Sequence, residues 1–283
     1  MNTFKIAVLL VALTVLFIWV GNLLGGRNGM IFAFSFALIM NFATYWFSDK
    51  LVLFMARAKP LAEKDAPEVY RIVRSLTQRS NMPMPKIYIM NTEVPNAFAT
   101  GRSPAHAAVC VTKGIMQALS TEELEGVLSH ELSHIKNRDT LVATIVASIA
   151  GAIFMLARIA QFTLIFGGRR RDKGVVGLVA MVVTIIVAPL AAILIQLAVS
   201  RAAEYRADKS GALMSHKPHA LANALRRIHA AAQRTPLNVN PTTAHMYIIN
   251  PFSGKSLMNL FSTHPPMEER VKRLEALAKT AQL

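Results

Sequence analysis

The residues His130-Glu131-Leu132-Ser133-His134 have the types and spacing of a zinc hydrolase centre. Two imidazoles at positions i and i+4 of a helix lie on one face, so both rings can bind the same Zn²⁺ ion. Glu131 lies between them and can act as the general base that takes a proton from a water at the metal. Because such a pentapeptide also arises by chance, its surroundings decide the interpretation.

A helix is expected to carry this motif. Ser120 followed by Glu123 has the pattern of a capping box, which starts helices. Apolar residues then continue at helical spacing through the motif, at Leu124, Val127, Leu128, Leu132 and Ile135.

A catalytic zinc normally has three protein ligands, so the two histidines require a partner elsewhere. Glu204 is the best candidate, because it directly follows an apolar segment and Asp208 comes one helical turn later. Asp208 could then hold a ligand histidine, since a carboxylate–imidazole contact fixes the ring tautomer. The same pattern is typical of a solvated helix start beside a membrane, but its pairing with His130 and His134 favours the metal site.

Four apolar segments are long enough to cross a bilayer, which takes about 20 helical residues. They are residues 6–24, 30–46, 141–166 and 175–199, in a chain that is 53% hydrophobic. We therefore predict a mainly α integral membrane protein with about four transmembrane helices. The third segment contains Arg158 and Gln161, so the last pair could instead re-enter the membrane as a hairpin. A cleaved signal peptide is a poorer interpretation of the first segment, which is too long and lacks a cleavage site.

The polar parts of the chain form two blocks around the second pair of apolar segments. We predict a two-helix membrane anchor at 1–46, a first protease block at 47–139, a hydrophobic hairpin at 140–199 and a second protease block at 200–283. Both blocks must lie on one side of the membrane if they share an ion. The basic loop 167–174 would prefer the cytoplasm, which conflicts with cytoplasmic blocks unless the hairpin re-enters.

The first block is expected to combine helix and strand. Residues 69–76 carry a helical apolar stripe behind an Asp65/Glu68 capping pattern, and residues 86–90 and 107–112 are predicted as short strands. Between these strands, residues 94–101 have turn residues at both ends. They could form an edge strand that accepts a peptide backbone or an ordinary connecting loop, and the spacing alone does not separate the two.

The net charge of +15 would suggest a nucleic-acid partner in a soluble protein. Here the basic residues are spread over the polar blocks without a stacking aromatic motif, and such residues typically contact anionic lipid or set topology. No nucleic-acid partner is therefore expected. The single Cys110 excludes an internal disulfide and fits a reducing compartment.

Together these residues resemble the M48 family of zinc metallopeptidases, in particular its membrane-bound bacterial heat-shock proteases. The likeness covers nearly the whole chain and includes the N-terminal spans, the segment 95–101 and the apolar hairpin. Residues 262–266, followed by Glu269, Arg270 and Leu274, look like the family's C-terminal signature. The metal-binding positions match the family pattern throughout, and the likeness there extends to Asn137, Asp139, Arg201, Glu204 and Asp208.

The resemblance implies a small α+β, zincin-like (gluzincin) protease domain with a short sheet and one Zn²⁺ per subunit. His130, His134 and Glu204 would be the metal ligands and Glu131 the catalytic base, with Asp208, Asn137 and Arg201 around them. The implied activity is that of a zinc endopeptidase that degrades misfolded or damaged membrane proteins in stress response and quality control. It would lie in the bacterial inner membrane, with the protease domain and both termini in the cytoplasm. The substrate would bind along Asn96, Ala97, Phe98, Ala99 and Thr100.

The group that stabilises the oxyanion is less well defined by the sequence. His264 and Tyr205 are the candidates, but His264, before Pro265-Pro266, could instead close the C-terminal fold, and Tyr205 could pack at the membrane interface.

Three other classes of protein compete with this interpretation. An intramembrane metalloprotease would carry the motif inside an apolar segment, whereas here it follows an acidic stretch. A prenyl-protein protease of the same broad family would use the same centre, and a non-catalytic scaffold with structural zinc would not need Glu131. The expected partners are membrane-protein substrates and the bilayer. The sequence leaves open a homo-oligomer or a complex with other membrane proteases or chaperones.

Overall fold

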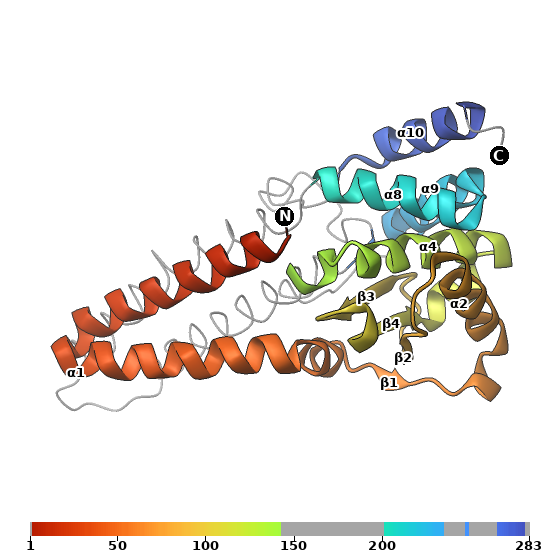
Figure 1. The fold of residues 1–283 in the computed structure, drawn as a ribbon. Coiled ribbons are helices and arrows are strands. Elements are labelled where there is room, and N and C mark those ends of the chain that lie inside the picture. The colour runs from red at the N-terminus through yellow and green to blue at the C-terminus, as the bar shows by residue number, and fades with distance from the viewer. Residues whose placement is uncertain (1, 143–200, 235–246, 249–264, 281–283) are drawn as a thin grey trace.

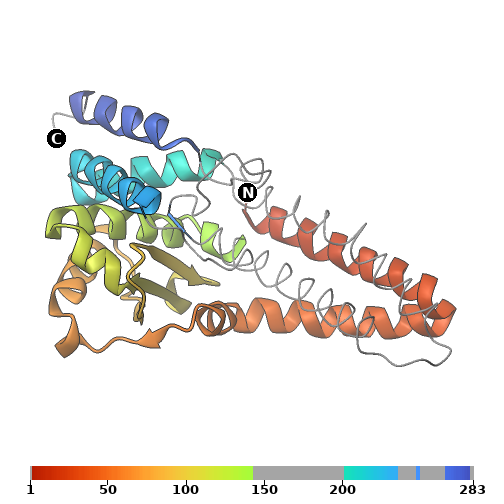
Figure 2. The same cartoon turned by 180° about the vertical axis from the view of Figure 1, so that it is seen from behind.

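The computed structural model describes residues 2–142, 201–234, 247–248 and 265–280. They form a small mixed sheet covered by helices, with a long helical hairpin that projects away from it (Figures 1 and 2). The helices are α1 (Asn2–Met55), α2 (Pro67–Ser80), α3 (Lys113–Ala118), α4 (Thr121–Lys136), α8 (Arg201–Ser215), α9 (Pro218–Arg234) and α10 (Met267–Thr280). The strands are β1 (Lys59–Pro60), β2 (Lys86–Met90), β3 (Ala97–Gly101) and β4 (Ala107–Thr112), with 3-10 turns η1 (Glu63–Asp65) and η2 (Pro104–His106).

Helix α1 consists of two antiparallel rods, because the backbone leaves helical geometry at Gly25 and Gly26 (Figure 1). Asn41 Nδ2 donates to Thr14 Oγ1 at 2.9 Å and so links the rods. Within the described residues, Gly25–Phe47 is the one helix long and apolar enough to cross a membrane, and Leu10–Trp19 is a shorter apolar stretch. The predicted spans at 141–166 and 175–199 fall almost wholly outside the described residues.

The sheet has the strand order β1-β2-β4-β3, with β2 and β4 parallel and the other two pairs antiparallel. Alternate residues of β4 face opposite layers, as the pleat requires. Val109 and Val111 pack in the core with α2 and α4, whereas Ala108 and Cys110 pack against the end of α1, at Leu53 and its neighbours. Helix α1 therefore continues beyond the apolar stretch into the core beneath the sheet.

The predicted strands are confirmed, because β2 and β4 have the bounds expected for 86–90 and 107–112. The edge-strand alternative for 94–101 is also confirmed, since this segment contains β3 at the end of the sheet. Among the described strands β3 pairs with β4 alone, so its other side has no strand neighbour.

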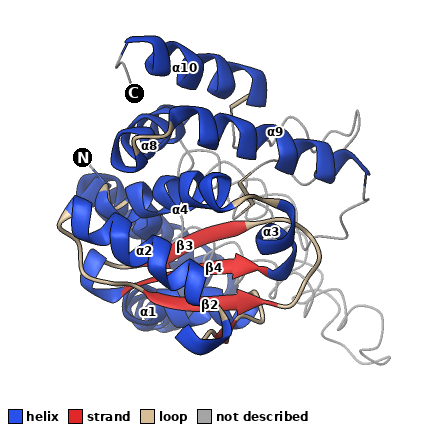
Figure 3. Ribbon diagram, turned by 90° about the vertical axis from the view of Figure 1, so that its right-hand side faces the viewer, coloured by secondary structure: helices blue, strands red, loops and turns tan. Residues whose placement is uncertain are grey.

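Helix α4 lies between the sheet and the pair α8 and α9, with α10 outermost (Figure 3). The predicted capping box is present: Glu123 N donates to Ser120 Oγ at 3.3 Å, and Ser120 N donates to Glu123 Oε2 at 2.9 Å. Two glycines let the neighbouring helices approach closely. A Cβ on Gly126 would lie 2.8 Å from the Leu221 backbone of α9, and one on Gly211 of α8 would lie 2.8 Å from the His130 backbone.

The Asp65/Glu68 capping prediction for α2 is wrong, although the apolar stripe at 69–76 is buried as expected. Asp65 belongs to the 3-10 turn η1, and Ala66 precedes the helix without a side-chain cap. Pro67 starts the helix instead, because its fixed φ suits the first turn and its missing N–H costs no hydrogen bond there.

Candidate active site

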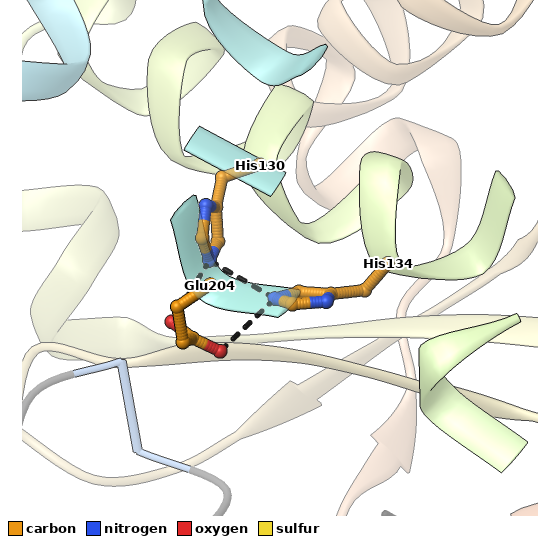
Figure 4. A group of neighbouring side chains, drawn as sticks. All are labelled: His130, His134 and Glu204. Carbon is orange, nitrogen blue, oxygen red and sulfur yellow. Dashed lines mark hydrogen bonds and ion pairs between the residues drawn. The ribbon is translucent and has the colours of Figure 1, made fainter. Parts of the chain in front are cut away.

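Three side chains from two helices converge beside the sheet (Figure 4). His130 Nε2 and His134 Nε2 lie 3.2 Å apart, and they are 3.7 Å and 3.3 Å from the two carboxylate oxygens of Glu204. The structure thus brings together the three ligands predicted from sequence, across 70 residues of chain.

This spacing suits a zinc ion. Ligand atoms about 2.0–2.1 Å from a tetrahedral metal lie about 3.3 Å from one another, which is close to the separations between His130, His134 and Glu204. Two nitrogens and one carboxylate leave one position of a tetrahedron for water, as in catalytic zinc sites.

The close contact at Gly211 brings α8 to the metal ligands. Because Gly211 has no Cβ, α8 lies directly against the backbone of α4 at His130. Glu204 and Asp208, one turn apart on the same face, are both buried and point into this contact. Asp208 Oδ1 lies 3.0 Å from His130 Nδ1, as predicted.

Behind Asp208 lies Arg270 of α10, a fully buried arginine with 1% exposure. Its Nε donates to Asp208 Oδ2 at 2.8 Å and its Nη2 to Oδ1 at 2.7 Å. Burial alone would raise the pKa of Asp208, but Arg270 and His130 outweigh it and hold that pKa at about 2. Asp208 is therefore a carboxylate that faces the ring of His130.

His134 has a carboxylate partner of its own. Its Nδ1 lies 3.4 Å from Asp139 Oδ2, and Arg206 Nη2 lies 3.5 Å from Asp139 Oδ1. Burial lowers the pKa of His134, but Asp139 and Glu204 more than reverse this effect and raise the pKa to about 10. The carboxylates around His134 therefore favour positive charge on its ring.

Glu131 lies on the same helix, between the two histidines, and is buried. Burial raises the pKa of its carboxyl group, the two histidines lower it, and a hydrogen bond from the Ala99 backbone also lowers it. The general base predicted from sequence is thus in contact with strand β3.

The predicted substrate segment, residues 96–100, consists of Asn96 and most of strand β3, which lies beside this base. Ala97 and Phe98 are buried, and Phe98 packs toward α1, on the face of the sheet opposite α4. Asn96 precedes the strand, and its Oδ1 accepts a hydrogen bond from Ile248 N at 3.1 Å. Among the described strands the outer edge of β3 has no neighbour, and Ala99 is the one residue of β3 that is partly exposed.

Comparison with known proteins identifies the family. Residues 63–278 match the profile of peptidase family M48, which is more than half of the chain. The chain belongs to peptidase family M48.

Two similar proteins carry the same name. Protease HtpX homologs from Syntrophobacter fumaroxidans and Thermodesulfovibrio yellowstonii are 53% and 56% identical to it, over 98% and 99% of this chain and 99% of each relative. The crystal structure of S. mikatae Ste24p has a TM-score of 0.52 at 18% identity. The match covers 97% of this chain and 65% of Ste24p, which shows a shared fold. This M48 chain is a membrane-bound metalloprotease.

The other residues predicted for the M48 site do not join the cluster of His130, His134 and Glu204 in the part of the chain that the structure describes. Arg201 is exposed at the first residue of α8 and, within the described part of the chain, forms no ion pair with the ligands. Asn137 ends α4, where its backbone N–H donates to Ser133 O at 2.9 Å. The ring of Tyr205 lies 3.8 Å under the Arg273 guanidinium of α10. His264 lies outside the described residues.

Two contacts of the M48 site were not predicted from the sequence. They are the contact of Asp139 with His134 and the contact of Arg270 with Asp208. Asp139 and Arg270 both belong to the family likeness, but the sequence pattern assigns no contact to either. Asp139 comes five residues after His134, so its closeness had a local signal. Arg270 lies 62 residues beyond Asp208, among charged residues of α10, and the sequence holds no sign that it is buried.

Proposed function

We propose that this chain is a zinc-dependent endopeptidase that cleaves unfolded segments of membrane proteins beside the bilayer. The observation that carries the proposal is the convergence of His130, His134 and Glu204 at the spacing of a tetrahedral ion, with Glu131 on the same helix. A structural zinc site usually has four protein ligands and needs no base, whereas three ligands with a neighbouring carboxylate suit hydrolysis.

A zinc ion held by these ligands would polarise the scissile carbonyl and lower the pKa of a water molecule towards about 7. Glu131 would take a proton from this water and later give it to the leaving amine. Burial supports this exchange, because it raises the pKa of Glu131 and so makes its carboxylate a better proton acceptor.

The substrate would bind in extended form along the edge of β3 that has no neighbour among the described strands. Such a peptide adds a strand through main-chain hydrogen bonds, which require little of its side chains. The hydrogen bond between Glu131 and the Ala99 backbone supports this placement, because a peptide beside Ala99 would also lie beside the base. Substrates with little sequence in common, such as misfolded or damaged membrane proteins, would suit this kind of recognition.

His264 is the proposed second donor to the oxyanion. It precedes Arg270 by six residues, and Arg270 Nη2 lies 3.4 Å from His130 Nε2. The chain that follows His264 therefore reaches the ligand His130 within six residues, at Arg270. One oxyanion donor is typically worth about 10²–10³ in rate.

The proposed location is the bacterial inner membrane, as a multi-pass protein with the protease blocks and both termini in the cytoplasm. The basic character of the polar blocks supports this orientation, because cytoplasmic segments near spans carry excess Lys and Arg. The apolar stretch Gly25–Phe47 supports the membrane anchor.

The test is cleavage of an unfolded membrane protein by the full chain in detergent, with zinc quantified in the same preparation. We expect one zinc per chain, cleavage that chelators abolish, and Glu131→Gln protein that binds zinc but does not cleave. Glu122→Gln is the matched control, since Glu122 is an exposed residue of the same helix that pairs with Lys217. Cleavage by the Glu131→Gln protein, or chelator-resistant cleavage by the wild type, would contradict the proposal. Zinc binding without any cleavage would favour a scaffold.

A further inference from the structure

Arg270 is the buried side chain that joins the most distant parts of the site. It belongs to α10, yet its guanidinium reaches atoms of α4, α8 and the segment at 247–248. An arginine presents five N–H donors in a rigid fork and stays charged at any working pH. Because Arg270 is only 1% exposed, its donors require acceptors within the protein. Its partners are Asp208, Glu204, His130 and the Ile248 carbonyl.

On one side, Arg270 holds the metal ligands. Its two hydrogen bonds to Asp208 are short and bidentate, and Asp208 in turn lies 3.0 Å from His130 Nδ1. Its Nη1 also lies 3.5 Å from Glu204 Oε2. The guanidinium therefore fixes Asp208, which orients His130, and it also lies against the carboxylate of Glu204.

On the other side, Arg270 contacts the residues that lead into strand β3. Its Nη1 donates to Ile248 O at 3.1 Å, and Ile248 N donates to Asn96 Oδ1 at 3.1 Å. Asn96 is the residue directly before β3, and it is bound to β4 through Thr112. A continuous chain of polar contacts thus runs from His130 to the start of the edge strand, and Arg270 is its centre.

We propose that Arg270 is a positioning residue that sets His130 through Asp208 and, through Ile248, keeps the start of strand β3 in register with the metal ligands. The inference rests on the proposed zinc site and adds to it a link between metal binding and the substrate strand. Lysine cannot replace arginine here, because a single ammonium has no planar fork for two carboxylate oxygens and a third acceptor.

The first experiment is a double-mutant cycle on zinc affinity, measured by chelator competition with the full chain in detergent. Arg270→Lys and Asp208→Asn should each weaken zinc binding by about 10- to 100-fold, as removal of a group behind a metal ligand typically does. The double variant should have about the same zinc affinity as the single variant that binds zinc less tightly, because the two residues act as one unit. Arg273→Lys, an exposed change three residues away on α10, should leave the affinity unchanged.

The second experiment measures hydrogen exchange of the Ile248 amide in the zinc-free protein. In the wild type its bond to Asn96 Oδ1 should protect it, and in the Arg270→Lys variant this protection should fall while core amides of α4 keep theirs. A residue that only supports the metal would not change exchange at Ile248.

Several results would overturn the inference. They are wild-type zinc affinity in the Arg270→Lys protein, independent effects of the two substitutions, or unchanged exchange at Ile248. Should Arg270→Lys fail to fold, the Arg270→Gln/Asp208→Asn protein removes both buried charges together, and wild-type zinc affinity in it would equally overturn the inference. Zinc affinity and exchange are read without cleavage, so wild-type protein that binds zinc but cleaves nothing would refute the proposed function alone.

Discussion

The two histidine ligands have the same kind of support in very different surroundings. His130 is backed by Asp208 and Arg270, whose side chains are 4% and 1% exposed, with arginine–carboxylate distances of 2.7 Å and 2.8 Å. His134 is backed by Asp139 and Arg206, which are 12% and 46% exposed, with one contact at 3.5 Å. Each unit is imidazole, carboxylate and guanidinium, but one is enclosed and the other borders the solvent.

The difference shows what burial adds to an identical set of groups. A charged pair near solvent is screened and typically contributes little. Breaking a buried pair leaves an uncompensated charge in a medium of low dielectric, which costs far more than the pair itself contributes. His130 should therefore be held rigidly and His134 loosely, with Glu204 as the ligand that both share.

The largest effect is expected at Glu204, because it is itself a proposed zinc ligand and lies against both histidines. Glu204→Gln should weaken zinc affinity by more than about 100-fold, beyond the range for groups behind a ligand, and abolish cleavage. Zinc content after dialysis and the cleavage rate measure this. Unchanged zinc content would mean that the third ligand lies elsewhere.

The next effect separates the two units. Asp208→Asn should weaken zinc affinity by about 10- to 100-fold, whereas Asp139→Asn should do so by less, because water can replace part of the lost contact. Chelator competition on both variants gives the ratio. Equal losses, or a larger loss at Asp139, would contradict the contrast between the enclosed and the solvent-bordering unit.

The next effect comes from helix packing and is measured chiefly on stability. Gly211→Ala and Gly126→Ala would each place a methyl group 2.8 Å from a neighbouring backbone, so both should lower the free energy of unfolding by about 1–3 kcal/mol. Gly211→Ala alone should also weaken zinc binding, because its neighbour is the backbone of His130. Thermal unfolding with zinc titration tests this, and an equal change in zinc affinity for both variants would refute it.

The smallest effect is expected at Arg206. Arg206→Gln should change zinc affinity by no more than about threefold, corresponding to well under 1 kcal/mol for an exposed pair, and the difference should shrink at high salt. The measurement is chelator competition at low and high ionic strength. A large, salt-independent loss would show that the exposed unit is as tightly coupled as the buried one.

The parts of the site that the sequence predicted correctly depend on short spacing or on donor chemistry. The helix start at Ser120 and the pair His130 and His134 follow from local patterns. Glu204 follows from the need for a third ligand and from its place directly after an apolar segment. Strands β2 and β4 follow from short apolar runs between turn residues.

The parts that were missed depend on contacts between distant segments. Arg270 lies among Glu268, Glu269, Lys272 and Arg273, so its own sequence context is that of a solvent-exposed helix. Its burial arises only because α10 packs near Asp208, and no local pattern encodes that approach. The Asp65 capping prediction failed for the opposite reason, since a local pattern was present but Pro67 started the helix.

Helix α1 joins the apolar stretch Gly25–Phe47 directly to the protease domain. From Gly26 its second rod runs without a helical break to Met55, two turns beyond the apolar stretch that ends at Phe47, and those turns pack beneath the sheet. At 1.5 Å per residue this extension is about 12 Å long. In the proposed membrane arrangement this extension would hold the active site at about that distance from the bilayer, and the distance of a peptide bond from the membrane would then limit whether it can be cleaved.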